Sequence, residues 1–192
     1  MADPAALLLA AGLSRRFGGP GKLLADWRGN PLALHAADTL AGLPLRRRVA
    51  VCRAGDAELA RLLSARGFDI VANPDPGRGL SSSLALGIRA LVAADAVMVA
   101  LADMPRVSSL HLRRLIEAAC TAPIVASTSG GGAPTPPAIF ARQMFPALLA
   151  LEGDTGARDL LHDATLVTAP AGELVDVDTL QDLADTQSPP SQ

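Results

Sequence analysis

Short, wholly apolar runs alternate with longer segments of helical spacing along most of the chain, and this alternation constrains the fold more than any other feature. The runs predict strands and the segments between them predict helices, an order that is typical of a mostly parallel sheet covered by helices. The expected strands are residues 5–11, 48–52, 68–72, 96–102 and 124–127, and the expected helices are residues 32–40, 56–65, 81–93 and 108–119. The run over 96–102 contains only apolar residues, which predicts a central strand buried on both faces.

The last third of the chain is less regular. The glycine- and proline-rich stretch over residues 129–137 predicts a loop, and residues 138–151 predict a strand followed by a helix. Short strands are expected at residues 166–168 and 174–177, and a last helix at residues 179–184. Because 192 residues fit one large domain, we expect a single domain over residues 1–185 and a disordered polar tail over residues 186–192.

The composition argues against several functional classes. Aromatic residues make up 3% of the chain, too few for a stacking platform that binds single-stranded nucleic acid. The formal net charge of −2 gives no field that would collect nucleic acid or an anionic membrane. Cys52 and Cys120 have neither metal-site nor disulfide spacing, and the three histidines are expected at surface or boundary positions. The cysteine usage indicates a reducing, cytoplasmic compartment. No apolar run is long enough to cross a bilayer and no cation precedes the first one, so we expect neither a membrane span nor a signal peptide.

The segment from Leu7 to Lys22 reads LLLAAGLSRRFGGPGK, an apolar strand that runs into a small-residue loop carrying cations. Such a loop brings bare backbone N–H groups close to a polyanion, and Arg16 and Lys22 add positive charge. It is not a P-loop, because Leu23 follows Lys22 where that motif requires Ser or Thr. It also lacks the Gly-x-Gly-x-x-Gly pattern of dinucleotide-binding folds. The segment therefore predicts a nucleoside triphosphate site that fits neither template.

Asp103 directly follows the apolar run over residues 96–102, which places a carboxylate at the carboxyl end of a central strand, where open α/β sheets bind ligands. A carboxylate at the end of a buried strand is costly unless it is paired, so a metal role is favoured. Mg²⁺ takes one or two carboxylates together with phosphate oxygens, so a second acid is expected. Asp176 and Asp178 are two apart on an extended segment and point the same way, which leaves both open.

The pattern Leu9-Ala10-Ala11-Gly12-x-Ser14-x-Arg16-Phe17-Gly18, followed by Lys22, resembles the start of the molybdenum cofactor nucleotidyltransferases, within the wider nucleotidyltransferase superfamily. Further segments follow in the order of that family and extend the resemblance over nearly the whole chain. They are Asn73-Pro74, Gly79-Leu80-Ser81-Ser82-Ser83-Leu84, residues 101–105, residues 153–158 and residues 176–179. The likeness is greatest to the cytidylyltransferases, because the first loop reads Ala10-Ala11-Gly12 where guanylyl-transferring relatives typically read Ala-Gly-Gly.

The resemblance implies a three-layer α/β/α sandwich with a Rossmann-like, mostly parallel sheet of the nucleotidyltransferase, or glycosyltransferase-A-like, type. It implies transfer of CMP from CTP to the terminal phosphate of a molybdopterin-type cofactor, with release of pyrophosphate and with Mg²⁺ or Mn²⁺ as the metal. A molybdoenzyme or its chaperone would be the protein partner. Two alternatives remain open: transfer of another nucleotide, such as guanylyl transfer or sugar- or alditol-phosphate nucleotidyl transfer, and a non-catalytic carrier that delivers the finished cofactor.

The resemblance also implies roles for individual residues. Arg16, Lys22 and Asp103 are expected to be catalytic, and Asp103 is expected to bind metal together with Asp178, which the family pattern favours over Asp176. The expected nucleotide-binding residues are Leu9, Ala10, Ala11, Gly12, Ser14, Arg16, Lys22, Asn73, Gly79, Ser81, Ser82, Ser83 and Asp103.

Asp154 and Arg158 are expected beside the second substrate, although their spacing alone also fits an ion pair on a helix surface. The chain departs from the family pattern in two places. More residues separate Gly18 from Lys22 than in many relatives, and residues 135–140 stand where relatives commonly have Gly-His-Pro.

Overall fold

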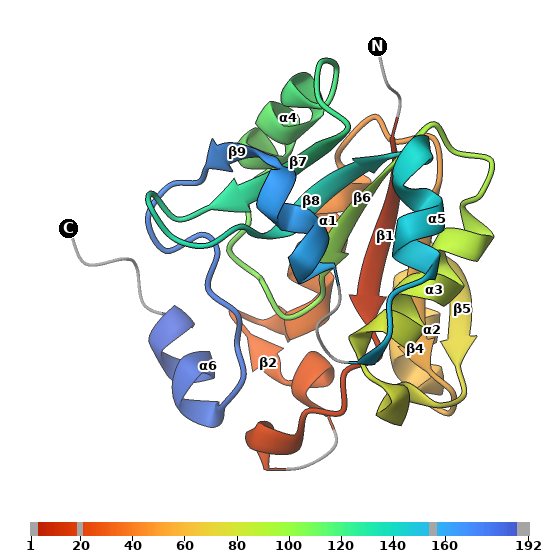
Figure 1. The fold of residues 1–192 in the computed structure, drawn as a ribbon. Coiled ribbons are helices and arrows are strands. Elements are labelled where there is room, and N and C mark those ends of the chain that lie inside the picture. Colours follow the sequence, from red (N-terminus) through yellow and green to blue (C-terminus); the bar gives the residue numbers. More distant parts are fainter. Residues whose placement is uncertain (1–3, 19–20, 154–156, 188–192) are drawn as a thin grey trace.

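A twisted sheet of seven strands forms the centre of the fold, in the order β5-β4-β1-β6-β8-β7-β9 (Figure 1). The computed structural model describes residues 4–18, 21–153 and 157–187. The strands are β1 (Ala5–Ala10), β4 (Arg48–Arg53), β5 (Asp69–Asn73), β6 (Ala96–Leu101), β7 (Ile124–Thr128), β8 (Thr135–Ala141) and β9 (Thr165–Thr168). Strand β8 runs antiparallel to β6 and β7, and the other neighbours pair in parallel. The predicted mostly parallel sheet is confirmed.

Helices cover both faces of the sheet, as the alternating side chains of β1 require. Ala6 and Leu8 pack in the core cluster of one face, beneath α1 (Leu32–Ala41), α2 (Ala57–Ser64) and α4 (Ser109–Ala118). Leu7 and Leu9 pack in the cluster of the other face, beneath α3 (Leu80–Ala90) and α5 (Phe145–Leu149). All four side chains are buried. The expected three-layer sandwich is therefore confirmed.

A small unit beside the sheet joins a short hairpin near the start of the chain to the last helix. The hairpin of β2 (Asp26–Trp27) and β3 (Asn30–Pro31) contributes Trp27, which packs with Leu32 and Val177 in a third buried cluster. The indole nitrogen Nε1 of Trp27 donates a 3.0 Å hydrogen bond to Oγ1 of Thr186 in the last helix, α6 (Leu180–Gln187). The remaining short helices are η1 (Arg15–Phe17), η2 (Lys22–Leu24), η3 (Pro76–Arg78), η4 (Arg142–Met144) and η6 (Arg158–Asp163).

Several sequence predictions about local structure are wrong. Residues 174–177 form a turn and an irregular segment, not a strand, because the amide of Val177 makes a single hydrogen bond to the carbonyl of Asp103 (2.9 Å) and no ladder. Thr186 and Gln187 were placed in a disordered tail, but they complete α6. The predicted loop over residues 129–137 ends earlier, because β8 already begins at Thr135. None of the described helices is long and apolar enough to cross a membrane.

His111 lies inside the protein, not at the surface or boundary position expected for the histidines. Its Nε2 atom bonds to Oγ of Ser127 at 2.8 Å, and that hydroxyl in turn donates to the carbonyl of Pro137 at 2.7 Å. Because the hydroxyl proton is already committed, Nε2 carries the proton of the ring. Among the described residues, Nδ1 of His111 has no hydrogen-bond partner. The ring therefore links α4 to β7 through the hydroxyl of Ser127.

Candidate active site

The glycine-rich segment and Asp103 meet at one edge of the sheet. Strands β1 and β6 are neighbours in register, with Leu9 opposite Leu101, and the amide of Ala102 donates to the carbonyl of Leu9 at 3.1 Å. Each strand ends there, so the segment that follows β1 and the carboxylate that follows β6 emerge side by side. This carboxyl edge is where open α/β sheets bind ligands.

A cleft of about 370 Å³ opens at this edge, a size typical of sites for small molecules. Of the residues predicted to bind nucleotide or metal, those that line it are Leu9, Ala10, Ala11, Gly12, Ser14, Arg16, Lys22, Gly79, Ser83, Asp103 and Asp178. A Cβ atom added at Gly12 would meet no protein atom within 4 Å. Packing within the protein therefore does not require a glycine at position 12. The backbone of Gly12 is open to a ligand.

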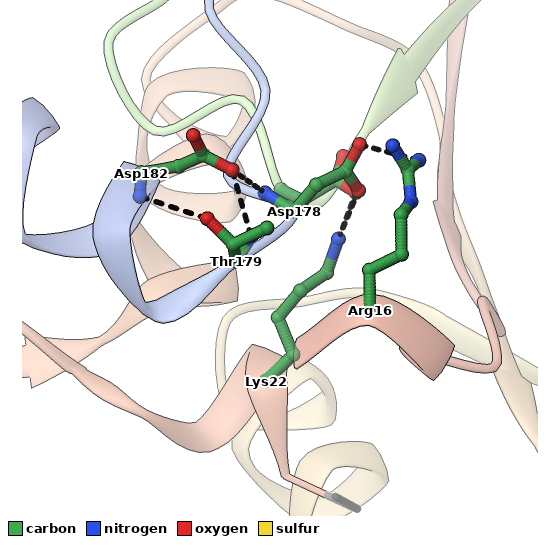
Figure 2. Close-up of polar contacts among 6 residues, drawn as sticks. Arg16, Lys22, Asp178, Thr179 and Asp182 are labelled. Atoms are coloured by element: carbon green, nitrogen blue, oxygen red, sulfur yellow. Dashed lines mark hydrogen bonds and ion pairs between the residues drawn. The ribbon is translucent and has the colours of Figure 1, made fainter. Parts of the chain in front are cut away.

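Two cations, Arg16 and Lys22, and two carboxylates, Asp103 and Asp178, meet inside the cleft. Figure 2 shows the side chains of Arg16 and Lys22 pointing towards Asp178. The Nζ atom of Lys22 lies 2.7 Å from Oδ2 of Asp103 and 3.2 Å from Oδ1 of Asp178. The guanidinium of Arg16 contacts the other carboxylate oxygen of Asp178 at 2.6 Å. The side chain of Lys22 is 7% exposed, whereas that of Arg16 is 75% exposed. Lys22 is thus fixed in the wall of the cleft, while Arg16 reaches into it from the surface.

Asp178, rather than Asp176, forms the ion pairs with the cations of the first loop. Burial raises the pKa of Asp176, and the neighbouring carboxylates of Asp178 and Asp103 raise it further. The charges of Asp103 and Asp178 thus act on the carboxyl group of Asp176. The ammonium of Lys22, however, forms hydrogen bonds with Asp103 and Asp178. This contact favours Asp178 over Asp176, and the metal role of either aspartate stays a prediction.

Asp103 and Asp178 fit the donor set of a hard divalent cation, because each contributes a carboxylate oxygen to the same ammonium nitrogen. Within the described ranges, no cluster of three or more His, Cys, Asp or Glu side chains could hold a metal. A metal at this place would draw two carboxylates from the chain and its other ligands from phosphate and water. That is the usual pattern for Mg²⁺ beside a nucleotide.

Asn73 organises the second segment that borders the cleft. Its buried amide nitrogen donates to Oγ of Ser82 at 3.0 Å and to Oγ of Ser83 at 2.8 Å, and its Oδ1 accepts the amide of Asp75 at 2.9 Å. The serines were expected to cap α3, but the N-cap is Gly79 and no side chain caps the helix. Asn73 instead holds the turn before α3 against the carboxyl end of β5.

The structure divides the predicted nucleotide residues between two hollows. Gly79 and Ser83 line the 370 Å³ cleft, whereas Asn73, Ser81 and Ser82 line a separate region of about 610 Å³ between α3 and residues 149–153. Asp154 lies outside the described residues, and nothing is described of the side chain of Arg158. Their expected place beside the second substrate stays a prediction.

Among the residues that sequence reasoning missed at this site, three have charged or hydrogen-bonding side chains. Arg15 also lines the cleft, and its position in the sequence gave no signal of a role at the site. Asp182 accepts a hydrogen bond from the amide of Asp178, and the hydroxyl of Thr179 accepts one from the amide of Asp182. The Thr-x-x-Asp spacing of these two residues is an N-terminal helix signal that could have found them.

Comparison with known proteins finds relatives along most of the chain. Residues 6–169 match the family model described as the MobA-like NTP transferase domain. The purine catabolism protein PucB of Bacillus subtilis is 31% identical over 188 residues, which cover 90% of each chain. Rv0371c from Mycobacterium tuberculosis H37Rv has a TM-score of 0.86 at 26% identity over 97% of each chain. Its complex with manganese has a TM-score of 0.81 at 24% identity, over 96% of this chain and 98% of that one.

Proposed function

Because the chain belongs to the MobA-like NTP transferase domain family, and is therefore a nucleotidyltransferase of that type, we propose that it transfers CMP from CTP to the terminal phosphate of a molybdopterin-type cofactor and releases pyrophosphate. The observation that carries the proposal is the cluster of Lys22, Arg16, Asp103 and Asp178 inside the cleft. It gathers the charges that nucleotidyl transfer requires next to a loop whose backbone is open to a ligand.

In this reaction, a phosphate oxygen of the acceptor attacks the α-phosphorus of the nucleotide, the new P–O bond forms and pyrophosphate leaves. The attacking phosphate is already ionised at neutral pH, so the chain contributes position and charge rather than a general base. Lys22 would neutralise charge from its fixed place in the cleft wall. Arg16, which is mostly exposed, would turn from Asp178 towards the triphosphate.

Asp103 and Asp178 are the residues that would hold Mg²⁺ or Mn²⁺. When bound, such an ion offsets the negative charge of the phosphate oxygens. The relative Rv0371c has been solved with manganese, which supports a divalent metal here as well. Removing one electrostatic group of this kind commonly lowers the rate by roughly a hundred- to a thousand-fold.

The preference for CTP rests on the first loop. Ala10 and Ala11 both line the cleft, and both side chains are nearly inaccessible to solvent. A methyl group at position 11 limits how closely a base can approach the backbone, whereas glycine would not. We therefore expect Ala11→Gly to reduce the ratio of CTP to GTP use, and an unchanged ratio would remove this argument for CTP.

The decisive experiment measures pyrophosphate release by the full chain with molybdenum cofactor, either Mg²⁺ or Mn²⁺, and either CTP or GTP. The proposal is supported if the wild type releases pyrophosphate with CTP and the Asp103→Ala variant does not. The control is Asp95→Ala, at the opposite end of β6, where Asp95 forms an exposed ion pair with Arg142. Release with GTP alone would favour the guanylyl alternative. No release with either nucleotide, together with retained binding of the cofactor, would favour a carrier.

A further inference from the structure

Asp178 lies two residues before the first residue of α6, and Thr179 and Asp182 form hydrogen bonds around this helix start (Figure 2). Oδ2 of Asp182 accepts the amide of Asp178 at 3.0 Å and the amide of Thr179 at 2.7 Å. In return, Oγ1 of Thr179 accepts the amide of Asp182 at 3.1 Å. These reciprocal bonds form a capping box, which satisfies amides that the first turn of a helix otherwise leaves unpaired. They also fix the peptide from which the carboxylate of Asp178 projects.

The far end of α6 is fixed as well. Thr186 is buried, and its hydroxyl accepts from Nε1 of Trp27 at 3.0 Å while donating to the carbonyl of Asp182 at 2.7 Å. The guanidinium of Arg28 binds the carbonyl of Gln187 at 2.9 Å. Because both ends are held, α6 cannot shift along its axis without breaking these bonds. The carboxylate of Asp178 is thus presented to Lys22 and Asp103 from a braced support.

We propose that Thr179 and Asp182 are positioning residues for the candidate metal pair. Their capping box sets the backbone of Asp178 so that its carboxylate converges with that of Asp103 on one cation. They act through Asp178, and neither lines the 370 Å³ cleft. Partners that orient a metal ligand commonly change metal affinity by 10- to 100-fold. This inference rests on the proposed function, because it takes Asp103 and Asp178 as the metal ligands.

The test measures the dissociation constant of Mn²⁺ for the full chain by electron paramagnetic resonance, which detects free Mn²⁺ and requires no turnover. We expect Asp182→Ala and Thr179→Ala to weaken Mn²⁺ binding by roughly 10- to 100-fold. Asp182→Asn and Thr179→Ser keep the oxygen acceptors and are expected to restore most of the affinity. The matched control is Asp185→Ala on the same helix, since Asp185 bonds only to the side chain of Gln181 among the hydrogen bonds found for it.

A purely structural role of the capping box would change thermal stability alone. Wild-type Mn²⁺ affinity in folded Asp182→Ala and Thr179→Ala would therefore overturn the positioning role. If the alanine variants do not fold, the Mn²⁺ affinity of Thr179→Val is measured instead, because valine removes the hydroxyl and keeps the shape of the threonine side chain. Unchanged affinity in that variant also overturns the proposal.

The experiment gives a different result if Asp103 and Asp178 are not the metal ligands. Asp103→Asn would then bind Mn²⁺ as tightly as the wild type, or the wild type would bind none. Either result rejects the proposed ligands, Asp103 and Asp178, and with them the positioning role.

Discussion

The ammonium of Lys22 donates a 2.7 Å hydrogen bond to Oδ2 of Asp103, a residue 81 positions later in the sequence, and also contacts Asp178. One buried cation therefore holds together two carboxylates that would otherwise repel each other. A divalent ion shared by the same carboxylates has to compete with this ammonium. Lys22 is thus both a partner for phosphate and an internal counter-ion of the candidate metal site.

Replacing Lys22 by methionine is expected to lower the stability of the metal-free protein by about 3 kcal/mol, because a largely buried ion pair loses its cation. Mn²⁺ should then raise the melting temperature of the variant more than that of the wild type, since the metal relieves the repulsion between Asp103 and Asp178. The extra increase should be several degrees, at roughly 2 to 4 °C per kcal/mol for a chain of this size. A thermal titration with Mn²⁺ checks this, and an increase no larger than in the wild type would contradict it.

Asp178→Asn and Asp176→Asn are expected to differ sharply. Asp178 contacts both Lys22 and Arg16, so its neutralisation should lower the rate of pyrophosphate release by roughly a hundred-fold or more. Asp176 is close to the same charges but does not share the ammonium between the two carboxylates, so the loss should be less than about ten-fold. Steady-state rates of pyrophosphate release by both variants at saturating metal test this difference. Equal losses would return Asp176 to the candidate metal ligands.

Gly87 is expected to be intolerant of alanine although it lies inside α3. Glycine-to-alanine changes in helices usually stabilise a protein by up to about 1 kcal/mol. Here an added Cβ would overlap the side chain of Leu7 in the central strand β1. We expect Gly87→Ala to destabilise the protein by about 1 to 3 kcal/mol in urea denaturation.

The double variant Leu7→Ala/Gly87→Ala tests whether this contact is the cause. Leu7→Ala alone should cost about 2 to 5 kcal/mol, because it leaves a cavity in the core. The double variant should cost less than the sum of the two single changes, since the shortened side chain makes room for the new methyl group. Additive losses would show that the overlap with Leu7 is not responsible.

His111 is expected to make stability fall in mildly acidic solution. Burial lowers its pKa from 6.5, and Arg114 lowers it further, against an opposing effect of Glu173. Above about pH 7 the ring is neutral in both states and contributes no pH dependence. Below the ordinary pKa the unfolded chain takes up a proton that the folded protein resists, so the free energy of unfolding falls as pH falls until the lowered folded pKa is reached.

Urea denaturation between about pH 8 and about pH 5 measures this effect. The wild type should lose more stability over that range than His111→Gln, which has no ring to protonate. Parallel curves for the two proteins would assign the acid sensitivity to other groups.

The sequence predicted the fold and most of the cleft, because both follow from local patterns. Apolar runs identified β1 and β6, and the adjacency of these strands explains why Lys22 lies near Asp103. The composition also distinguishes Lys22 from the other cations, because it is the only lysine among the 17 Lys and Arg residues. The predicted single domain over residues 1–185 and the roles of the site residues stay predictions.

The failures have a common physical cause, which is that long-range contacts override local patterns. Val177 is buried against Trp27 and Leu32 without belonging to a strand. Thr186 looks like part of a polar tail, but its hydroxyl meets an indole 159 positions earlier. Pro136 and Pro137 read as loop residues because proline cannot donate to a ladder, yet both lie in β8.

The hydrogen bond between Trp27 and Thr186 also bears on when the protein becomes competent during its synthesis. Arg16, Lys22 and Asp103 leave the ribosome well before Asp178, whose contact with Lys22 spans 156 positions. Contacts of such separation form late, because long loops must close first. A nascent chain can therefore build the sheet and the mouth of the cleft while still lacking half of its carboxylate pair. Translation of the segment that contains Asp178 completes that pair, so both proposed metal ligands are present only after all strands of the sheet have been made.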